Sequence, residues 1–567
     1  MRELVDVAIG KEKADLVLKN ATLVNVCSSE LYETDIAIAR GIVIGLGRYD
    51  GREEIEARGK YAVPGLIDGH THIEMSMLSV CEFAKAVVPR GTTSVVADPH
   101  ELANVLGIEG IIAILEDAKQ TALKVFCMAP SCVPSTAPSA GLETSGAIIT
   151  PEAVKDLLRT EGIIGLAEVM DYRGVIAKEE EIWTKLEIAH ALNAPIDGHA
   201  PRLRGKELNA YVLSGAGSDH ENTSYEEAQD KLRVGMRLMV REGSAAKNLR
   251  ELAPLLKTVD TRHCMLVTDG DRTPRDLKEA GYLDYVLRRA IEEGIDPVKA
   301  VQMCTLNTAE WFKLDGKIGS ISPGKIADIV LLKDLEAFVV ERVIVNGQTE
   351  FTPPSVYRYN NYPQYGESVR INRITPDVFV IPQEGVKKAR IIGLIKGELL
   401  TDALVAEISG IDIARDILKI AVVERHQKSG NIGLGFVNGF GLKTGAVAST
   451  IAHDAHNIVV IGTNEADMAF ACNRLKAIGG GIVLCKGSEV TCELELPVAG
   501  LMSNKGLDYV VKQQKELDDK ISEMGCELQA PIITMSFLAL PVIPKLKITD
   551  KGLVDVEKRE IVDIFVS

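Results

Sequence analysis

The stretch PGLIDGHTHIE, residues 64–74, places a short apolar run after a Pro-Gly turn signal and then two histidines one residue apart. Side chains alternate between the two faces of a strand, so His70 and His72 point the same way and can share one metal ion. A short apolar run bounded by turn residues is typical of a buried strand. We therefore predict a strand before His70 with half of a metal site at its carboxyl end.

Working outward, the same pattern of a short apolar run followed by an amphipathic helix recurs seven more times. The seven runs are TTSVVADPH (92–100), KVFCMAP (124–130), IIGLAEVM (163–170), APIDGHA (194–200), GAGSDHENT (215–223), MRLMVREG (236–243) and HCMLVTDG (263–270). With the first strand this makes eight βα units, the number in a (β/α)8 TIM barrel. We predict that residues 63–317 form this barrel.

The segments that flank the barrel have a different pattern. Residues 15–62 alternate short β-branched runs with turn residues, which indicates hairpins, and GKIADIVLLKD (324–334) continues that pattern after the barrel. We expect residues 1–62 and 318–375 to form one composite β-sandwich domain. Residues 376–567 then form a separate C-terminal α+β domain.

Composition limits the partners. The formal net charge of -16 and the sequence pI near 5.3 disfavour nucleic acid and anionic membranes, because both need concentrated Lys and Arg. No apolar stretch approaches the roughly 20 residues that span a bilayer, and the N-terminus lacks a signal-peptide core. The ten cysteines occur singly, which favours buried thiols over disulfides. We expect a cytoplasmic protein with a small-molecule substrate.

Further ligand candidates stand at the ends of other predicted barrel strands, where active sites of this fold assemble. They are Glu168, His199, His220 and Asp269. Together with the first two histidines they exceed what one tetrahedral site uses, and imidazole with carboxylate suits zinc, manganese or ferrous iron. We therefore predict a two-metal centre. His190 and His263 are interpreted as ordinary hydrogen-bonded residues.

The sequence resembles a known family. VPGLIDGHTHIE (63–74) resembles the opening signature of the amidohydrolase superfamily, and several further strings are similar to the adenine deaminase family in order and over nearly the full length. These strings are ADPHELANVLG, PSCVPSTAPSAG, TDGDRTPRDL, TLNTAEWFKL, IAHDAHNIVVIGTN and LPVAGLMS. The resemblance implies a metal-dependent hydrolase that acts on adenine.

The resemblance also implies roles for the ligand candidates. His70 and His72 would bind one metal ion and His199 and His220 the other, while Glu168 bridges them where many amidohydrolases use a carboxylated lysine. Asp269 would complete the coordination of the ion bound by His70 and His72, and would exchange protons with the attacking water. The implied catalytic residues are Asp269, Glu168 and His220, and the implied cofactors are two divalent ions, Mn²⁺ or Fe²⁺, with Zn²⁺ as an alternative.

The implied reaction converts adenine to hypoxanthine and ammonia, in purine salvage or adenine catabolism. Two metal ions make hydroxide available near neutral pH, and a carboxylate can move the proton from water to the leaving amine. His100 and Glu101 are candidates for binding the ring, with a helix N-cap and first-turn acid as their alternative interpretation. The glycine inserted in TDGDRTP leaves the role of Asp271 open.

Alternatives remain. The sequence also fits another amidohydrolase, such as an N-acetylglucosamine-phosphate deacetylase or a dihydropyrimidinase-like ring opener. The ring opener would require a bridging lysine, which GLAEVM lacks. If the protein were a non-catalytic scaffold on the same fold, some of the metal ligands would be expected to be missing. All six candidate ligands are present. His453, Asp454 and His456 in IAHDAHN are closely spaced, and we favour a structural role over a metal site. We expect a homodimer or a higher homo-oligomer.

Overall fold

Eight parallel strands form the centre of the computed structural model, which describes residues 2–350, 363–383, 385–396 and 398–566. All eight predicted strand segments are strands. They are β6 (Leu66–Thr71), β7 (Thr92–Ala97), β8 (Lys124–Ala129), β9 (Ile163–Val169), β10 (Ile196–Gly198), β11 (Ser218–Asp219), β12 (Arg237–Arg241) and β13 (Cys264–Val267). Hydrogen bonds join β6 to β10 in one parallel sheet and β11 to β13 in a second. The two sheets meet where β13 contacts β6 and where β10 contacts β11, which gives a TIM-barrel-like α/β fold.

The barrel strands are buried on both faces, as parallel strands covered by helices are. Ile67, Val96, Met128, Ala167 and Met239 come from five different strands and pack in one buried cluster inside the barrel. The surrounding helices are α2 (Val80–Val87), α3 (His100–Leu106), α4 (Ile108–Ala118), α5 (Pro151–Leu157), α6 (Tyr172–Ala177), α7 (Glu180–Ala191), α8 (Gly205–Leu213), α9 (Tyr225–Arg233), α10 (Leu249–Leu256), α11 (Pro274–Glu279), α12 (Leu283–Glu292), α13 (Pro297–Met303) and α14 (Leu306–Trp311).

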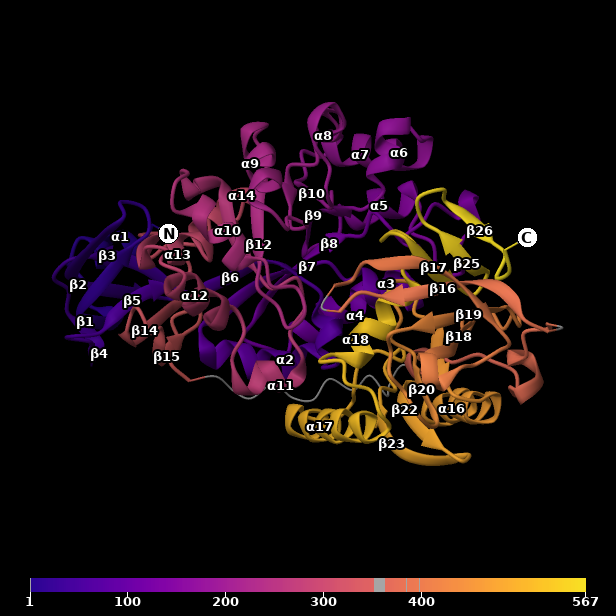
Figure 1. The fold of residues 1–567 in the computed structure, drawn as a ribbon. Coiled ribbons are helices and arrows are strands. Elements are labelled where there is room, and N and C mark those ends of the chain that lie inside the picture. The colour runs from indigo at the N-terminus through magenta and orange to yellow at the C-terminus, as the bar shows by residue number, and fades with distance from the viewer. Residues whose placement is uncertain (1, 351–362, 384, 397, 567) are drawn as a thin grey trace.

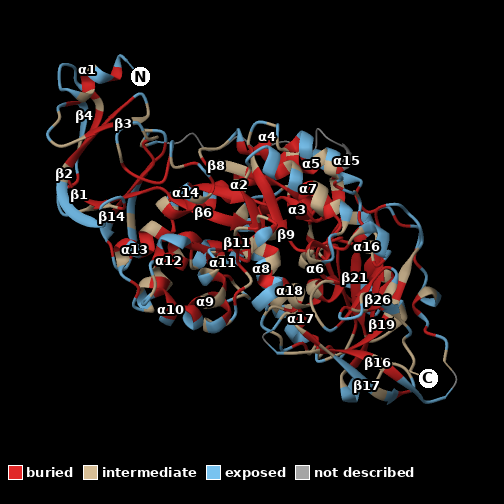
Figure 2. Cartoon of the chain, turned by 90° about the horizontal axis from the view of Figure 1, so that it is seen from above, coloured by how far each residue is buried: buried red, intermediate tan, exposed pale blue. Residues whose placement is uncertain are grey.

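The amphipathic pattern explains how these helices cover the barrel. In α12 the buried residues Leu283, Val286, Leu287 and Ala290 recur at spacings of three and four and therefore share one face. Figure 2 shows this arrangement in the whole molecule, with buried strands at the centre and exposed residues on the outer helices.

One sheet is built from both flanks of the barrel (Figure 1). The short helix α1 (Leu4–Ala8) precedes its strands, which are β1 (Ala14–Asn25), β2 (Glu30–Ala39), β3 (Ile42–Leu46), β4 (Gly51–Glu56), β5 (Tyr61–Pro64), β14 (Ile329–Asp334) and β15 (Val339–Ile344). β14 pairs antiparallel with β5, with Ile329 opposite Pro64. The chain thus returns to its N-terminal sheet after completing the barrel.

The C-terminal part has an eight-stranded sheet in the order β17-β16-β19-β18-β21-β20-β22-β23, and a smaller sheet of β24, β25 and β26. After the short helix α15 (Pro363–Gly366), its elements are β16 (Lys387–Leu394), β17 (Thr401–Ile408), β18 (Ile417–Val423), β19 (Ile432–Asn438), β20 (Ala446–Ser449), β21 (Ile458–Gly462), α16 (Glu465–Ile478), β22 (Gly481–Lys486), β23 (Glu489–Glu495), α17 (Leu507–Glu523), α18 (Pro531–Ser536), β24 (Leu546–Thr549), β25 (Gly552–Asp555) and β26 (Glu560–Val562).

The C-terminal part is joined to the barrel loops by specific contacts. Thr144 donates from its backbone N–H and its hydroxyl to Asp550, at 2.9 and 2.7 Å. The backbone N–H of Leu507 donates to Glu82 at 3.1 Å. A single buried apolar cluster runs from barrel residues into the C-terminal sheet. The C-terminal part is therefore packed against the barrel.

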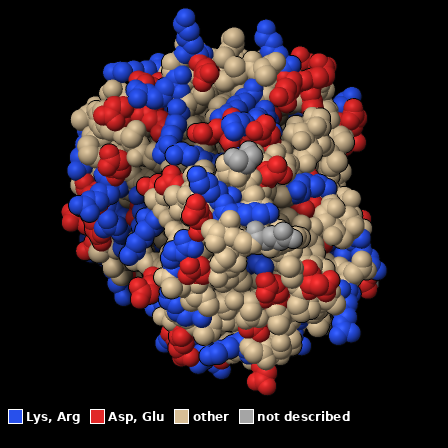
Figure 3. Space-filling model, turned by 45° about the vertical axis from the view of Figure 1, so that its right-hand side comes forward, with Lys and Arg blue, Asp and Glu red and all other residues tan. Residues whose placement is uncertain are grey.

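The surface mixes charges of both signs. On the face shown in Figure 3, basic and acidic side chains are interspersed. Among the helices of the described residues, none has both the length and the apolar composition that crossing a membrane requires. Nine of the ten cysteines are buried, as predicted, and Cys27 is exposed.

Candidate active site

The six predicted ligands converge at the carboxyl ends of the barrel strands. Glu168 lies at their centre and offers one oxygen to each side. Its Oε1 is 3.8 Å from His70 Nε2 and 3.6 Å from His72 Nε2. Its Oε2 is 2.7 Å from His199 Nδ1 and 3.3 Å from His220 Nε2. Oε1 therefore faces His70 and His72, with His100 Nδ1 also 3.5 Å away, and Oε2 faces the other two imidazoles.

Asp269 follows β13 and faces the first pair. Its Oδ1 is 3.2 Å from His70 Nε2, 3.3 Å from His72 Nε2 and 4.0 Å from His220 Nε2. The inserted glycine explains how this carboxylate reaches the site. Gly270 has φ +65°, and a Cβ there would lie 2.6 Å from the backbone N and O of His72. Only glycine permits this close approach of the β13 loop to the first strand.

Hydrogen bonds orient the first two imidazoles. His70 Nδ1 donates to Asp197 Oδ2 at 3.0 Å, and His72 Nδ1 donates to the backbone carbonyl of Asp98 at 2.9 Å. Because Nδ1 is the donor in both hydrogen bonds, each Nε2 is left facing the centre of the site. Sequence reasoning missed Asp197, although it stands on a barrel strand two residues before His199.

Burial raises the pKa of both central carboxyls, but nearby positive groups outweigh it. His220 and His199 hold the pKa of Glu168 well below its usual range. His220, His70, His72 and Arg241 do the same for Asp269. His70 Nε2 and Glu168 Oε2 are buried and have no hydrogen-bond partner among the described residues. Ionised carboxylates and unpartnered imidazole nitrogens that converge in this way fit divalent metal ions.

Arg241 was also missed by sequence reasoning. It ends β12 and donates from Nη1 to Asp269 Oδ2 at 2.8 Å. The same guanidinium binds Glu221, with Nη2 at 3.0 Å from Oε2. The only signal in the sequence was a charged residue at the carboxyl end of a barrel strand, directly after Leu238, Met239 and Val240. Asp269 is thus held from one side by an arginine and faces histidines on the other.

The remaining sequence candidates have distinct positions. Asp271 accepts from the backbone N–H groups of Ala245 and Ala246, at 2.7 and 2.6 Å, and lies outside the ligand groups. His190 Nε2 donates to the Ser214 carbonyl at 2.7 Å. His263 precedes β13 in a short turn of 3₁₀ helix, away from the site.

His100 and Glu101 lie in the first turn of α3, and neither provides the helix with a side-chain cap. His100 Nδ1 is 3.0 Å from Asp98 Oδ2 and 3.5 Å from Glu168 Oε1. Glu101 instead reaches the C-terminal part, where its Oε1 is 2.7 Å from His453 Nδ1 and its Oε2 contacts His456 Nε2. The IAHDAHN segment therefore adjoins the barrel site.

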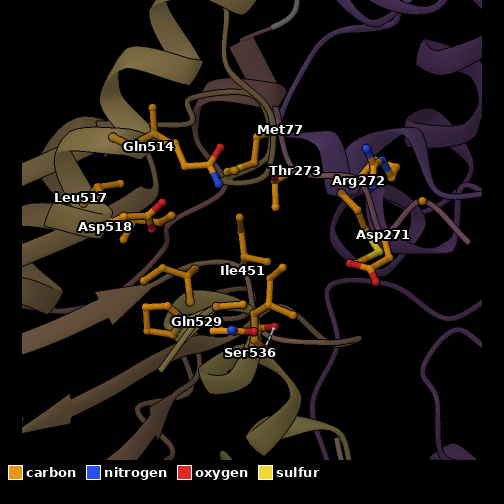
Figure 4. A pocket seen from close by; sticks show the side chains of 18 of the residues that line it. Met77, Asp271, Arg272, Thr273, Ile451, Gln514, Leu517, Asp518, Gln529 and Ser536 are labelled. Atoms are coloured by element: carbon orange, nitrogen blue, oxygen red, sulfur yellow. Dashed lines mark hydrogen bonds between the residues drawn. The ribbon is translucent and has the colours of Figure 1, made fainter. Parts of the chain in front are cut away.

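The pocket above the ligand candidates is closed by the C-terminal part. The residues that this part contributes to the lining are Leu399, His453, Asp454, Ile533, Phe537, Leu540 and Ile543. A neighbouring cavity of about 100 Å³, shown in Figure 4, lies between the barrel and the C-terminal part. It is lined mainly by apolar side chains and shares Met75, Asp271, His453 and Ile533 with the pocket.

Two family models match separate parts of the chain. Residues 61–349 match the amidohydrolase family, and residues 395–560 match the adenine deaminase C-terminal domain. The chain is 50% identical to an adenine deaminase of Archaeoglobus fulgidus, over 100% of this chain and 98% of that protein. It is 43% identical to one of Dehalococcoides mccartyi and 42% identical to one of Clostridium acetobutylicum, each over 98% of both chains. A solved Xaa-Pro dipeptidase matches 59% of this chain and 100% of its own, at 15% identity and TM-score 0.43.

Proposed function

The chain belongs to the adenine deaminase family of the amidohydrolases, and from this we propose that its barrel pocket hydrolyses adenine to hypoxanthine and ammonia. The observation that carries the proposal is the position of Glu168, with one oxygen toward the His70 pair and the other toward the His199 pair. Such an arrangement suits a carboxylate that bridges two cations. The reaction belongs to purine salvage or adenine catabolism.

The family implies a divalent metal centre, and the distances to Asp269 and Glu168 support the following ligands. His70, His72 and Asp269 would hold one ion, His199 and His220 would hold the second, and Glu168 would contribute one oxygen to each. Mn²⁺ or Fe²⁺ suits this mixed set of imidazoles and carboxylates, with Zn²⁺ as the alternative. When bound, such ions would lower the pKa of a water molecule far enough to make hydroxide available near neutral pH.

Asp269 is the group that moves protons in the proposed reaction. Its carboxylate takes a proton from the attacking water and delivers it to the exocyclic amino group of adenine. The water oxygen forms a bond to C6, and the bond between C6 and the amino nitrogen breaks as ammonia leaves. Arg241 contacts Asp269 Oδ2 and leaves Oδ1 facing the imidazoles, so it fixes the orientation of the carboxylate. His220 stands within reach of both carboxylates.

The pocket suits an uncharged base better than a phosphosugar. Arg241 is the only lysine or arginine among the lining residues that the structure describes, and it is already paired with Asp269 and Glu221. A phosphosugar deacetylase would need a free cation there. We also propose the division of the chain into residues 1–62 with 318–375, residues 63–317 and residues 376–567.

The test is conversion of adenine by the purified protein, followed by the change in ultraviolet absorbance and by ammonia release. We expect turnover after loading with Mn²⁺ or Fe²⁺, and about two metal ions per chain by elemental analysis. Chelated protein serves as the control and should be inactive until metal is restored. Absence of adenine turnover with Mn²⁺, Fe²⁺ and Zn²⁺ in turn would disprove the proposal.

A further inference from the structure

The C-terminal wall of the pocket has two polar side chains among apolar ones. Leu399, Ile533, Phe537, Leu540 and Ile543 are apolar, whereas His453 and Asp454 are polar. All of them belong to the part of the chain outside the barrel, so none takes part in the ligand set assigned above. The two polar residues are adjacent in sequence, but their close contacts differ.

His453 is held by close contacts on both sides. Its ring stacks on Phe537 with centroids 4.4 Å apart, and its Nδ1 is 2.7 Å from Glu101 Oε1. The other oxygen of Glu101 accepts from His456. The backbone N–H of Ala452 donates to His456 Nδ1 at 3.1 Å, so the proton of that neutral ring is on Nε2, which faces Glu101. This proton occupies the position that a metal ion would need. Glu101 therefore joins the two parts of the chain through a hydrogen bond from His456 and a close contact with His453.

Asp454 has no such partner. Its Oδ2 is buried and makes no hydrogen bond within the described residues, and its Oδ1 is 3.9 Å from His453 Nδ1, beyond hydrogen-bond distance. The residue is 2% exposed and lies beside His100 and Glu101. Buried carboxylate oxygens are rarely left without a partner, because desolvation without a hydrogen bond is unfavourable. Such a group in a pocket therefore calls for a ligand that pairs with it.

The orientation of the substrate identifies the ligand atom. Because C6 of adenine must meet the ligand set at the barrel end, the opposite edge of the base faces the C-terminal wall. That edge carries N3, which only accepts, and the ring N–H of the five-membered ring. Burial raises the pKa of Asp454 to about 6, so above pH 7 its carboxylate is mainly ionised and can only accept.

We propose that Asp454 is a specificity-determining residue whose Oδ2 accepts the ring N–H of a free purine base. This inference rests on the proposed function and assigns part of the substrate recognition to the C-terminal domain. A nucleoside or any base alkylated at N9 has no N–H at that position and brings bulk toward a buried carboxylate. A site that is built to bond a substrate N–H discriminates strongly against an analogue without it, because its own polar group is then left unpaired.

The experiment compares adenine with 9-methyladenine in the metal-loaded wild type and in Asp454→Ala and Asp454→Asn. We expect the wild type to favour adenine by at least about 10²-fold in kcat/KM. Asp454→Ala should raise KM for adenine by roughly tenfold or more, with a smaller change in kcat, and should narrow the preference for adenine. Asp454→Asn keeps a carbonyl acceptor. Its KM for adenine and its preference for adenine should therefore lie between those of the wild type and Asp454→Ala.

The matched control is Asp467→Asn in α16. Asp467 is also a buried carboxylate of the C-terminal domain, but it bonds Asn464 and the backbone of Ser488 and does not line the pocket. Asp467→Asn should leave kcat/KM for adenine and for 9-methyladenine unchanged. Metal content and thermal unfolding of every variant report on folding and on the metal site.

Two results would overturn the inference. One is an Asp454→Ala enzyme with unchanged KM and unchanged preference for adenine, and the other is loss of metal in that variant, which indicates a structural role. If wild type lacks deaminase activity, the proposed function fails on its own. Equilibrium binding of adenine and 9-methyladenine then decides the inference. Preference of wild type for adenine that is lost in Asp454→Ala supports it, and equal or absent binding contradicts it.

Discussion

At the scale of single residues, the position of Glu168 favours a carboxylate that bridges two metal ions over a buried carboxylate with only a structural role. Its side chain is almost fully buried, and five imidazoles, including that of His100, lie within 3.8 Å of its two oxygens. Without cations, protonated imidazoles would have to balance the negative charge of the Glu168 carboxylate. With them, the same carboxylate offsets the repulsion between two ions.

Glu168→Gln tests that role, because it keeps the shape and removes the charge. The amide nitrogen cannot coordinate a cation, so we expect loss of about one metal equivalent and a fall in kcat of roughly several hundredfold. Elemental analysis and the adenine assay measure both effects. Asp269→Asn is the matched comparison and should keep more metal while losing turnover, since it removes the proton carrier. Two retained metals with near-normal activity in Glu168→Gln would contradict the bridge.

At the scale of elements, one buried arginine holds the IAHDAHN segment in place. Arg425 follows β18 and is fully buried. Its guanidinium donates to the backbone carbonyls of Ser368 and Ala499, both at 2.9 Å, and to that of His456. Three segments far apart in the sequence are joined through one planar group with several donors.

Arg425→Lys should therefore loosen the wall of the pocket. A lysine ammonium cannot reach three carbonyls in different directions, and each buried carbonyl left unpaired costs about 1–3 kcal/mol. We expect the free energy of unfolding to fall by about 2–4 kcal/mol and KM for adenine to rise. Denaturant titration and steady-state kinetics measure these changes. Arg474→Lys, at a partly exposed pair with Glu493, should change the free energy by less than about 1 kcal/mol. Equal effects in the two variants would count against this role of Arg425.

At the scale of the whole molecule, the C-terminal domain contains a buried lysine that makes stability depend on pH. Lys547 is fully buried and donates to the carbonyls of Leu399 and Phe537, at 2.9 and 3.0 Å. No ion pair of Lys547 is found among the described residues, and burial lowers its pKa from 10.5 to about 7. Between these values the unfolded chain binds more protons than the folded chain.

The free energy of unfolding should therefore gain a component that rises with pH from about 7 to about 10. The slope of this component is at most about 1.4 kcal/mol per pH unit. Below pH 7 the slope falls to zero, because Lys547 is protonated in both the folded and the unfolded chain. Lys547→Met should remove this component, whereas Lys558→Met, at an exposed position, should retain it. Denaturant titrations at pH 6, 8 and 9 measure the slopes. Parallel curves for wild type and Lys547→Met would disprove the prediction.

The sequence by itself determined the barrel strands and the six ligand candidates. Strand periodicity and turn residues act over a few residues, and the fold rule that sites form at strand carboxyl ends then placed His70, Glu168 and Asp269 at one rim. The return of β14 to the N-terminal sheet was also predictable, because its β-branched pattern continues that of the first block. These inferences need only local patterns and a known order of elements.

Only the tertiary structure decided which groups face one another across long separations. The contact between Glu101 and His456 joins residues 355 positions apart, and Arg241 reaches Asp269 from a neighbouring strand. No local pattern encodes such pairs, because they depend on side-chain direction and on how the C-terminal domain packs over the barrel. Asp454 has an unpaired buried oxygen for the same reason. Burial and partnership are properties of the packed molecule, and a sequence of closely spaced polar residues does not specify them.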